Sequence, residues 1–173
     1  MALYSFEGNA PQIAESAYVH DSAQIIGNVV IGEECFIGAG AIIRGDYGEL
    51  LIGRRTAIEE GSVIHCPPLT TCEIGSDVTI GHGAILHSAT IGDSAIIGMG
   101  AILSFGAVVG EWAIVAEGTV VTMGKEIPAR KIAAGNPAKI IGDTTDEHQK
   151  LWARGKDIYA ELCCRYKEGL KKL

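Results

Sequence analysis

Three of the five histidines of this 173-residue chain lie in one stretch, at His65, His82 and His87. The neutral imidazole nitrogen is a common ligand of Zn²⁺, and three histidines with an open fourth position form catalytic rather than closed structural sites. A divalent metal held in this way lowers the pKa of a bound water toward ~7, so that hydroxide is available at neutral pH. The alternative is three unrelated surface side chains, as we expect for the isolated His20 and His148.

The spacing of the three histidines places two of them together and one apart. His65 and His87 each follow an aliphatic residue, Ile64 or Leu86, that a six-residue repeat puts on the same face one coil apart. Their side chains therefore start about 4.8 Å apart, the spacing of neighbouring strands, and can converge on one metal. His82 belongs to the preceding face and cannot close on that metal within one chain. We expect it to complete the site of a neighbouring subunit in a three-fold oligomer, a homotrimer.

The elements that would position these residues are the short strands of a repeat. An aliphatic residue recurs every six positions, and a small or β-branched residue often follows four positions later. The aliphatic positions are Val19, Ile25, Ile31, Ile37 and Ile43, then Ile52, Ile58 and Ile64, then Ile74, Ile80 and Leu86, and finally Ile91, Ile97, Leu103, Val109, Val115, Val121 and Ile127. Period six fits neither a helix nor ordinary strands. It is typical of a solenoid, and we predict one of roughly six coils over residues 1–142, with an N-terminal lead-in.

The repeat changes register between residues 43 and 52, 64 and 74, and 86 and 91. Extra residues in a solenoid are extruded as loops, often on the binding face, and these breaks flank the histidines. Residues 143–173 predict a C-terminal helix packed on the solenoid, in which Thr144 and Glu147 offer a capping box. Its predicted inward face consists of Leu151, Gly155, Ile158, Leu162, Tyr166 and Leu170.

The composition excludes several classes of function. The net charge of −7 argues against a nucleic-acid partner, which requires a basic surface. The 23 glycines and only 6% aromatic residues suit a narrow core of small aliphatic side chains. No apolar run approaches the ~20 residues that span a membrane, so we expect no membrane partner. The five cysteines have no disulfide spacing and no secretory signal precedes them, which predicts buried free thiols and a cytoplasmic location.

Three segments, Ile43-Arg44-Gly45-Asp46, Ile58 to His65 and Ile80 to His87, together resemble the γ-class carbonic anhydrases. The similarity is greatest to the compact subgroup that includes phenylacetate-pathway and carnitine-operon proteins, and it covers nearly the whole chain. It implies a mainly β fold, a left-handed parallel β-helix with three faces per coil and a C-terminal α-helix. It also implies a zinc site formed by His65 and His87 of one subunit and His82 of the next. The activity it implies is reversible hydration of CO₂ by a metal-bound hydroxide.

The same resemblance assigns roles to five further residues. Arg44 and Asp46 would form an ion pair between subunits, and Glu60 would hydrogen-bond that arginine. Glu59 would orient the reacting water or take its proton, and Tyr159 would reach the site from the final helix. The long acidic loop that carries proton-shuttle glutamates in the family is missing. Each assignment has a structural alternative. Arg44 and Asp46 could form an ordinary surface ion pair worth under about 1 kcal/mol. Glu59 and Glu60 could lie at a solvated corner, and Tyr159 could serve only to pack the helix.

Other functions remain compatible with these residues. Three imidazoles also accept Fe²⁺ or Co²⁺ in place of Zn²⁺. An acyl-CoA transferase or thioesterase of the hexapeptide-repeat class would use one catalytic histidine and a cleft between subunits. A non-enzymatic trimer could use zinc only to hold its subunits together. Metal content and the separate replacement of His65, His82 and His87 by alanine distinguish the three.

Overall fold

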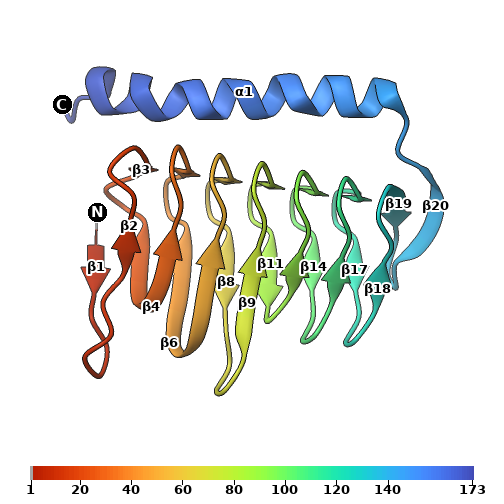
Figure 1. Ribbon diagram of the computed structural model, residues 1–173, viewed down its shortest axis with the longest axis horizontal. Helices are drawn as coiled ribbons and strands as arrows, with labels where there is room; N and C mark the ends of the chain where they lie inside the picture. Colours follow the sequence, from red (N-terminus) through yellow and green to blue (C-terminus); the bar gives the residue numbers. More distant parts are fainter. Residues whose placement is uncertain (1) are drawn as a thin grey trace.

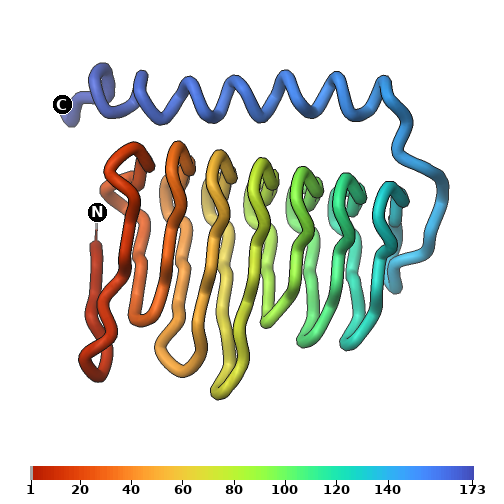
Figure 2. Tube along the Cα trace, in the orientation of Figure 1, coloured from red at the N-terminus to blue at the C-terminus, as the bar shows by residue number. Residues whose placement is uncertain are grey.

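The computed structural model describes residues 2–173. The chain forms a parallel β-solenoid of about seven turns, and one helix, α1 (Asp146–Gly169), runs along its side (Figure 1). The helix runs back along the coils, so the C-terminus ends on the side of the molecule where the chain begins (Figure 2). The prediction of a mainly β solenoid of hexapeptide repeats with a C-terminal helix is therefore confirmed.

The strands fall into two sheets, and every pairing between the strands of the described residues is parallel except that of β19 with β20. One sheet contains β1 (Ala2–Tyr4), β2 (Gln12–Ile13), β4 (Gln24–Ile31), β6 (Ile42–Ile52), β8 (Val63–His65), β9 (Thr71–Ile74), β11 (Ile85–His87), β12 (Thr90–Ile91), β14 (Ile102–Leu103), β15 (Val108–Val109), β17 (Val120–Val121) and β18 (Glu126–Ile127). The other contains β3 (Tyr18–Val19), β5 (Phe36–Ile37), β7 (Ala57–Ile58), β10 (Thr79–Ile80), β13 (Ile96–Ile97), β16 (Ile114–Val115), β19 (Lys131–Ala134) and β20 (Lys139–Asp143). The first sheet supplies two of the three faces, because the long strands β4 and β6 pass from one face to the other.

The core consists of hexad residues stacked one coil above another. Ile25, Ile43, Ile64, Leu86, Leu103 and Val121 are paired in register along the solenoid and are fully buried. The small residues four positions after the aliphatics are buried as well, since a larger side chain would crowd the axis. Gly98 shows how close successive coils lie: a Cβ there would sit 2.5 Å from the backbone nitrogen of Glu117. Six-residue periodicity therefore identified the core correctly.

The three register breaks have different structures. The residues of the first break lie within β6, but Gly27 of β4 pairs with Gly45 and Val29 pairs with Leu50, so residues 46–49 bulge out of the ladder with the preceding coil. The second break forms a loop over residues 66–70, between β8 and β9, and this loop extends away from the coils (Figure 2). In the third break only Ser88 and Ala89 separate β11 from β12. In the first break the extra residues are thus extruded as a bulge within β6 and not as a separate loop.

Helix α1 begins one residue later than the sequence indicated. Thr145 is the N-cap: its hydroxyl accepts a hydrogen bond from the backbone N–H of His148, and His148 Nδ1 accepts one from the Thr145 N–H. The expected pairing of Thr144 with Glu147 is wrong, since Thr144 is buried and donates to the carbonyl of Trp112 at 2.9 Å. The described residues contain no helix with an apolar run long enough to cross a membrane.

The inward face of α1 differs from the predicted one. Lys156 and Cys163 are buried, and Tyr159, Leu162 and Tyr166 pack against Tyr18, Phe36 and Ala57 of the solenoid. Leu151 is 67% exposed, and Ile158 and Leu170 are each 53% exposed, so their assignment to the inward face is wrong. Hydropathy misled here because a lysine and a small cysteine occupy the closest contact. Four of the five free cysteines are buried as expected, but Cys164 is exposed.

An arginine on the solenoid fastens the helix to the coils. Arg55 Nε donates to Asp77 at 2.9 Å, and Arg55 Nη2 donates to Asp157 of α1 at 2.7 Å. The pKa of Arg55 is raised because both carboxylates stabilise its charge against the effect of burial. One side chain thus connects two coils and the helix.

Candidate functional site

His65 and His87 lie together on the face formed by β8 and β11. Strand pairing places His87 directly opposite His65, as the hexad count predicted. Their rings are stacked, with centroids 5.3 Å apart and planes inclined by 12°. The two imidazoles therefore point the same way from adjacent coils and can act on one bound group.

Arg44 and Asp46 lie beside this pair on β6. Arg44 is in register with His65, and its Nη1 donates to Asp46 Oδ2 at 2.6 Å. The ion pair forms within one chain, whereas the resemblance implied a pair between subunits. Burial alone would raise the pKa of Asp46, but the hydrogen bond and charge of Arg44 outweigh it, so the pKa is lowered and the carboxylate is ionised.

His65 is a neutral imidazole at neutral pH. Burial, the charge of Arg44 and the neighbouring His87 lower its pKa below 6.5, although Asp46 acts in the opposite direction. His65 Nε2 lies 3.6 Å from Asp46 Oδ1, too far for a hydrogen bond. Both atoms are buried and have no hydrogen-bond partner among the described residues. Unpaired buried polar atoms are costly, and at this position they indicate atoms kept available for a ligand or substrate.

His82 lies at a different corner of the coil, after β10 of the second sheet. Its ring sits between two carboxylates, with Nδ1 2.8 Å from Glu60 Oε2 and Nε2 3.1 Å from Glu59 Oε2. Within one chain Glu60 faces His82, and its implied role as a partner of Arg44 stays a prediction. His82 is thus separated from the His65–His87 pair within the chain, as the register predicted.

Tyr159 connects helix α1 with this second corner. Its ring packs against Phe36 at a centroid distance of 5.3 Å. Burial raises the pKa of Tyr159, and its hydrogen bond to Glu59 and the charge of that carboxylate raise it further. The side chain therefore both packs against the solenoid and contacts a candidate site residue.

The donor set fits a metal only if a second copy contributes to it. Residues 2–173 contain no group of three or more histidine, cysteine or acidic side chains able to hold a metal ion. The pair of stacked imidazoles, one with an unpartnered buried nitrogen, supplies two nitrogen ligands of the type that Zn²⁺ takes. A third nitrogen would have to come from another copy.

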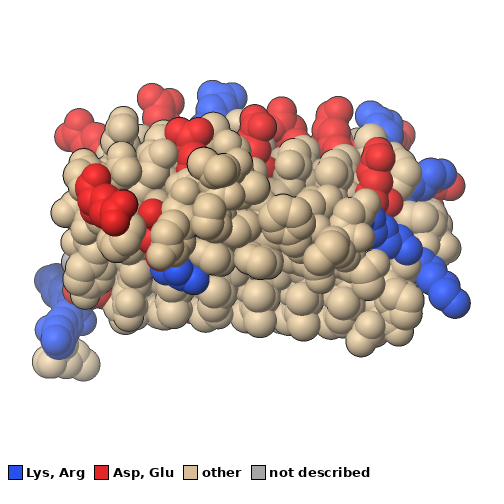
Figure 3. Space-filling model, turned by 90° about the horizontal axis from the view of Figure 1, so that it is seen from below, with Lys and Arg blue, Asp and Glu red and all other residues tan. Residues whose placement is uncertain are grey.

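A column of apolar side chains runs next to the histidine pair, and the sequence analysis missed it. Ile42, Val63, Ile85, Ile102 and Val120 are paired in register along the solenoid and project outward. Val63 and Ile85 each stand two residues before a histidine of the pair. Ile85 is 45% and Ile102 39% exposed. The signal was available, because each of these residues precedes a core aliphatic at a position that normally faces solvent. Figure 3 shows that charged side chains are sparse over the middle of the underside of the solenoid.

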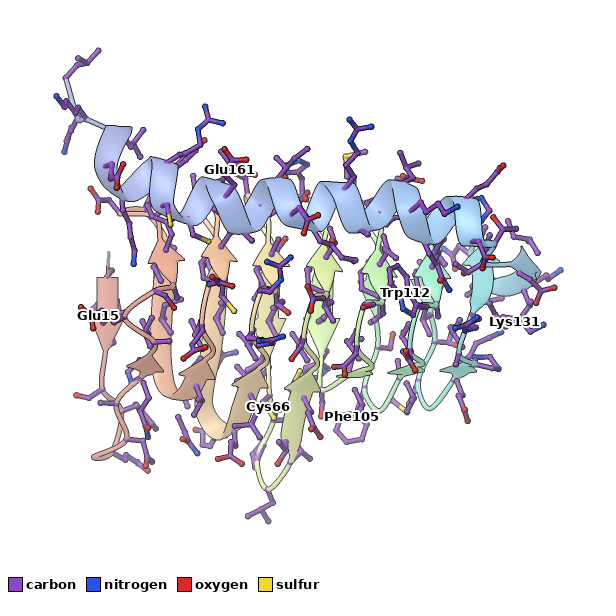
Figure 4. The ribbon with its side chains drawn as sticks, turned by 45° about the horizontal axis from the view of Figure 1, so that its top comes forward. Glu15, Cys66, Phe105, Trp112, Lys131 and Glu161 are labelled. Atoms are coloured by element: carbon purple, nitrogen blue, oxygen red, sulfur yellow. The ribbon has the colours of Figure 1, made fainter. Side chains whose placement is uncertain are left out.

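Phe105 is the second feature that sequence reasoning missed. Its ring lies edge-on to His87 at a centroid distance of 6.2 Å, and the side chain is 40% exposed. Figure 4 shows Phe105 and Cys66 at the end of the coils farthest from α1, whereas Trp112 lies beneath the helix. The His65–His87 pair is thus bordered by apolar groups on a face that the chain itself leaves open.

Comparison with known proteins supports a hexapeptide-repeat assignment. Residues 10–45 match the bacterial transferase hexapeptide family, and residues 72–105 match the hexapeptide repeat of succinyl-transferase. The chain is 37% identical to the carnitine operon protein CaiE of Proteus sp., over 98% of this chain and 86% of that protein.

Two solved structures share the whole architecture. A Bacillus cereus protein described as a "putative acetyltransferase" has a TM-score of 0.95 and 38% identity, with coverage of 96% of this chain and 97% of that one. A hexapeptide transferase family protein from Anaplasma phagocytophilum has a TM-score of 0.90 and 34% identity, with coverage of 95% and 98%. The repeats match family models, the fold matches solved members, and the similarity to CaiE covers nearly the whole of this chain. The chain therefore belongs to the hexapeptide-repeat transferase family.

Proposed function

We propose that the chain is an enzyme whose active site forms between copies, where His82 of one copy meets His65 and His87 of the next. Three copies around a three-fold axis would give each interface one complete set of histidines. The apolar column through Val63, Ile85 and Ile102 supports this assembly, because contiguous exposed aliphatic residues mark surfaces that become covered. Two hollows of the chain, of about 540 and 430 Å³, lie at the C-terminal end of α1 and contain none of these histidines.

The reaction class we propose is acyl-group transfer from a thioester such as an acyl-CoA, to an acceptor or to water. The observation that carries it is the neutral His65, with a buried and unpartnered Nε2 beside the ionised Asp46. The solved hexapeptide transferase and the B. cereus protein support the same class. This position suits a general base, which must be unprotonated and free to accept a proton.

In this reaction His65 Nε2 takes the proton of the acceptor's amine or hydroxyl, or of water, as that group attacks the thioester carbonyl. The carbon–sulfur bond then breaks, and the proton passes from the imidazole to the departing thiolate. The negative charge of Asp46 favours the imidazolium that exists between the two proton transfers, since its Oδ1 lies 3.6 Å from the nitrogen that carries the proton. Arg44 keeps Asp46 ionised for this purpose.

A second candidate is metal-dependent hydration of CO₂, and the stacking of His65 on His87 favours it. His65, His87 and the His82 of a second copy would hold Zn²⁺, Fe²⁺ or Co²⁺, which all accept imidazole nitrogen. When bound, such an ion lowers the pKa of a water toward ~7. Glu59 is nearly buried and would lie at the same interface, where it could hold or accept a proton.

One set of measurements on anaerobically purified protein separates the two candidates. Metal content is determined first, and the same sample is assayed for thiol release from short acyl-CoAs, with and without amine acceptors, and for CO₂ hydration by stopped flow. His65→Ala, His82→Ala and His87→Ala are compared with wild type. Acyl transfer predicts thiol release without bound metal and its loss mainly in His65→Ala.

Stoichiometric metal lost in all three variants, together with CO₂ hydration, would replace acyl transfer by the second candidate. A protein with neither activity, whose oligomer dissociates on chelation, would refute both and leave a zinc-stabilised scaffold. If the protein is a monomer at micromolar concentration, the proposal that the active site forms between copies is refuted.

A further inference from the structure

The side chain of His82 is restrained by two acidic residues of its own chain. Nδ1 faces Glu60 Oε2 at 2.8 Å, and Nε2 faces Glu59 Oε2 at 3.1 Å. At these distances each ring nitrogen faces a carboxylate oxygen. A histidine held in this way has no nitrogen left for a group on another copy.

The Glu59 carboxylate stays in place whether or not the His82 ring contacts it. Its side chain is 8% exposed, and Oε2 also accepts a hydrogen bond from the backbone N–H of His82 at 3.1 Å. Tyr159 provides a second hydrogen bond to this carboxylate. Glu59 can therefore lose the ring nitrogen and remain paired, at little cost.

Glu60 differs in both respects. Its side chain is 43% exposed, and its Oε2 contacts the ring of His82 at the shorter of the two distances. The backbone connects the two residues further, since the carbonyl of Glu60 accepts a hydrogen bond from the N–H of Gly83, which directly follows the histidine. An exposed carboxylate at the same corner of the neighbouring coil can follow the His82 ring as the ring swings away from Glu59.

We propose that Glu60 is the positioning residue of His82. Glu59 contacts the ring only in the separate chain, and the ring leaves this carboxylate when the copies associate. The inference rests on the proposed function, because His82 has to reach a second copy. A carboxylate on one ring nitrogen fixes the orientation of the ring and leaves the other nitrogen with its lone pair for a ligand or proton. In His82, Glu60 accepts the hydrogen bond from Nδ1–H, and Nε2 is the nitrogen that binds a ligand or takes a proton.

The test compares Glu60→Gln with Glu59→Gln, which remove one negative charge each at nearly constant shape. The first readout is the ¹⁵N spectrum of histidine-labelled, metal-free protein at pH 8, with the His82 signals assigned through His82→Ala. We expect Glu60→Gln to shift the Nδ1 signal and redistribute the ring tautomers. We expect Glu59→Gln to change only the Nε2 signal.

The second readout is Co²⁺ affinity, followed by its absorption spectrum in the assembled protein. Loss of a carboxylate that orients a ligating histidine costs about 10- to 100-fold in metal affinity, so we expect that loss in Glu60→Gln. Glu59→Gln should bind Co²⁺ as tightly as wild type or more tightly, because a competitor for Nε2 is removed. Glu60→Asp, which keeps a carboxylate, should recover part of the affinity.

Equal responses of the two variants, or a larger loss in Glu59→Gln, would overturn the assignment. If wild type binds no Co²⁺, the metal candidate fails and the ¹⁵N spectra alone decide the inference. A Nδ1 signal unchanged by Glu60→Gln would then refute it, whatever reaction the enzyme performs.

Discussion

Lys156 offers the most direct test of how helix α1 is held on the solenoid. The residue is 4% exposed, and its ammonium lies 3.4 Å from the hydroxyl of Thr79 and 5.6 Å from the ring centroid of Trp112. Burial lowers the pKa of Lys156 from 10.5 to about 8, and the charge of Asp77 offsets only part of this effect. We predict that replacing this lysine by methionine stabilises the protein at neutral pH.

The magnitude follows from the two pKa values. The gap between about 8 in the folded chain and 10.5 in the unfolded one corresponds to about 3 kcal/mol against the charged form. Methionine keeps the unbranched stem beneath Trp112 and carries no charge. Loss of the contacts with Thr79 and with the Trp112 ring reduces this gain in stability by about 1 kcal/mol. The free energy of unfolding at pH 7 should therefore rise by about 2 kcal/mol.

The lowered pKa of Lys156 also determines how stability depends on pH. A lysine whose pKa is lowered on folding destabilises fully below the folded value, and the penalty disappears as pH rises toward the unfolded value. Wild type should therefore gain stability between pH 8 and 10.5 relative to Lys156→Met. The advantage of the variant should shrink to zero over that range and turn slightly negative above it.

The assay is urea denaturation at pH 7, 8, 9 and 10, with the fluorescence of the two tryptophans as the signal and with protein concentration fixed. Lys150→Met, which changes an exposed lysine of the same helix, is the matched control and should have little effect. A variant less stable than wild type at pH 7 would refute the reasoning. So would a stability gain that does not depend on pH, since packing alone could then explain it.

Three further changes test other parts of the fold by the same denaturation assay. Arg55→Lys should cost about 1 kcal/mol, because a single ammonium cannot bridge Asp77 and Asp157 as the guanidinium does; faster proteolysis in α1 would accompany it, and unchanged stability would contradict the bridge. Gly98→Ala should cost about 2 kcal/mol or more, since its Cβ would lie 2.5 Å from the backbone of the next coil, and a neutral result would mean that the coils can separate. Thr145→Ala should cost about 1 kcal/mol through loss of the N-cap, a loss that serine at this position should avoid.

The parts of the molecule that were predictable from sequence are those governed by a strict repeat. A solenoid places residues six positions apart on successive faces, so counting hexads from Ile64 to Leu86 was enough to put His65 beside His87. The same count separated His82 from them. It works because every coil must bury its aliphatic residue on the one below, and a slip of one residue would expose the whole core.

Where the repeat gives way to corners and to the helix, sequence was a weaker guide. The partners of His82 depend on the directions in which Glu59 and Glu60 leave a tight turn, and no hydropathy pattern encodes those directions. The helix face was misjudged for a related reason. A hydropathy pattern assigns any lysine to the solvent-facing side of a helix. Lys156 is buried nevertheless, because its aliphatic stem is apolar and its ammonium lies over the ring of Trp112. Regular elements thus fix positions along the chain, whereas the chemistry of this site arises at the irregular positions between them.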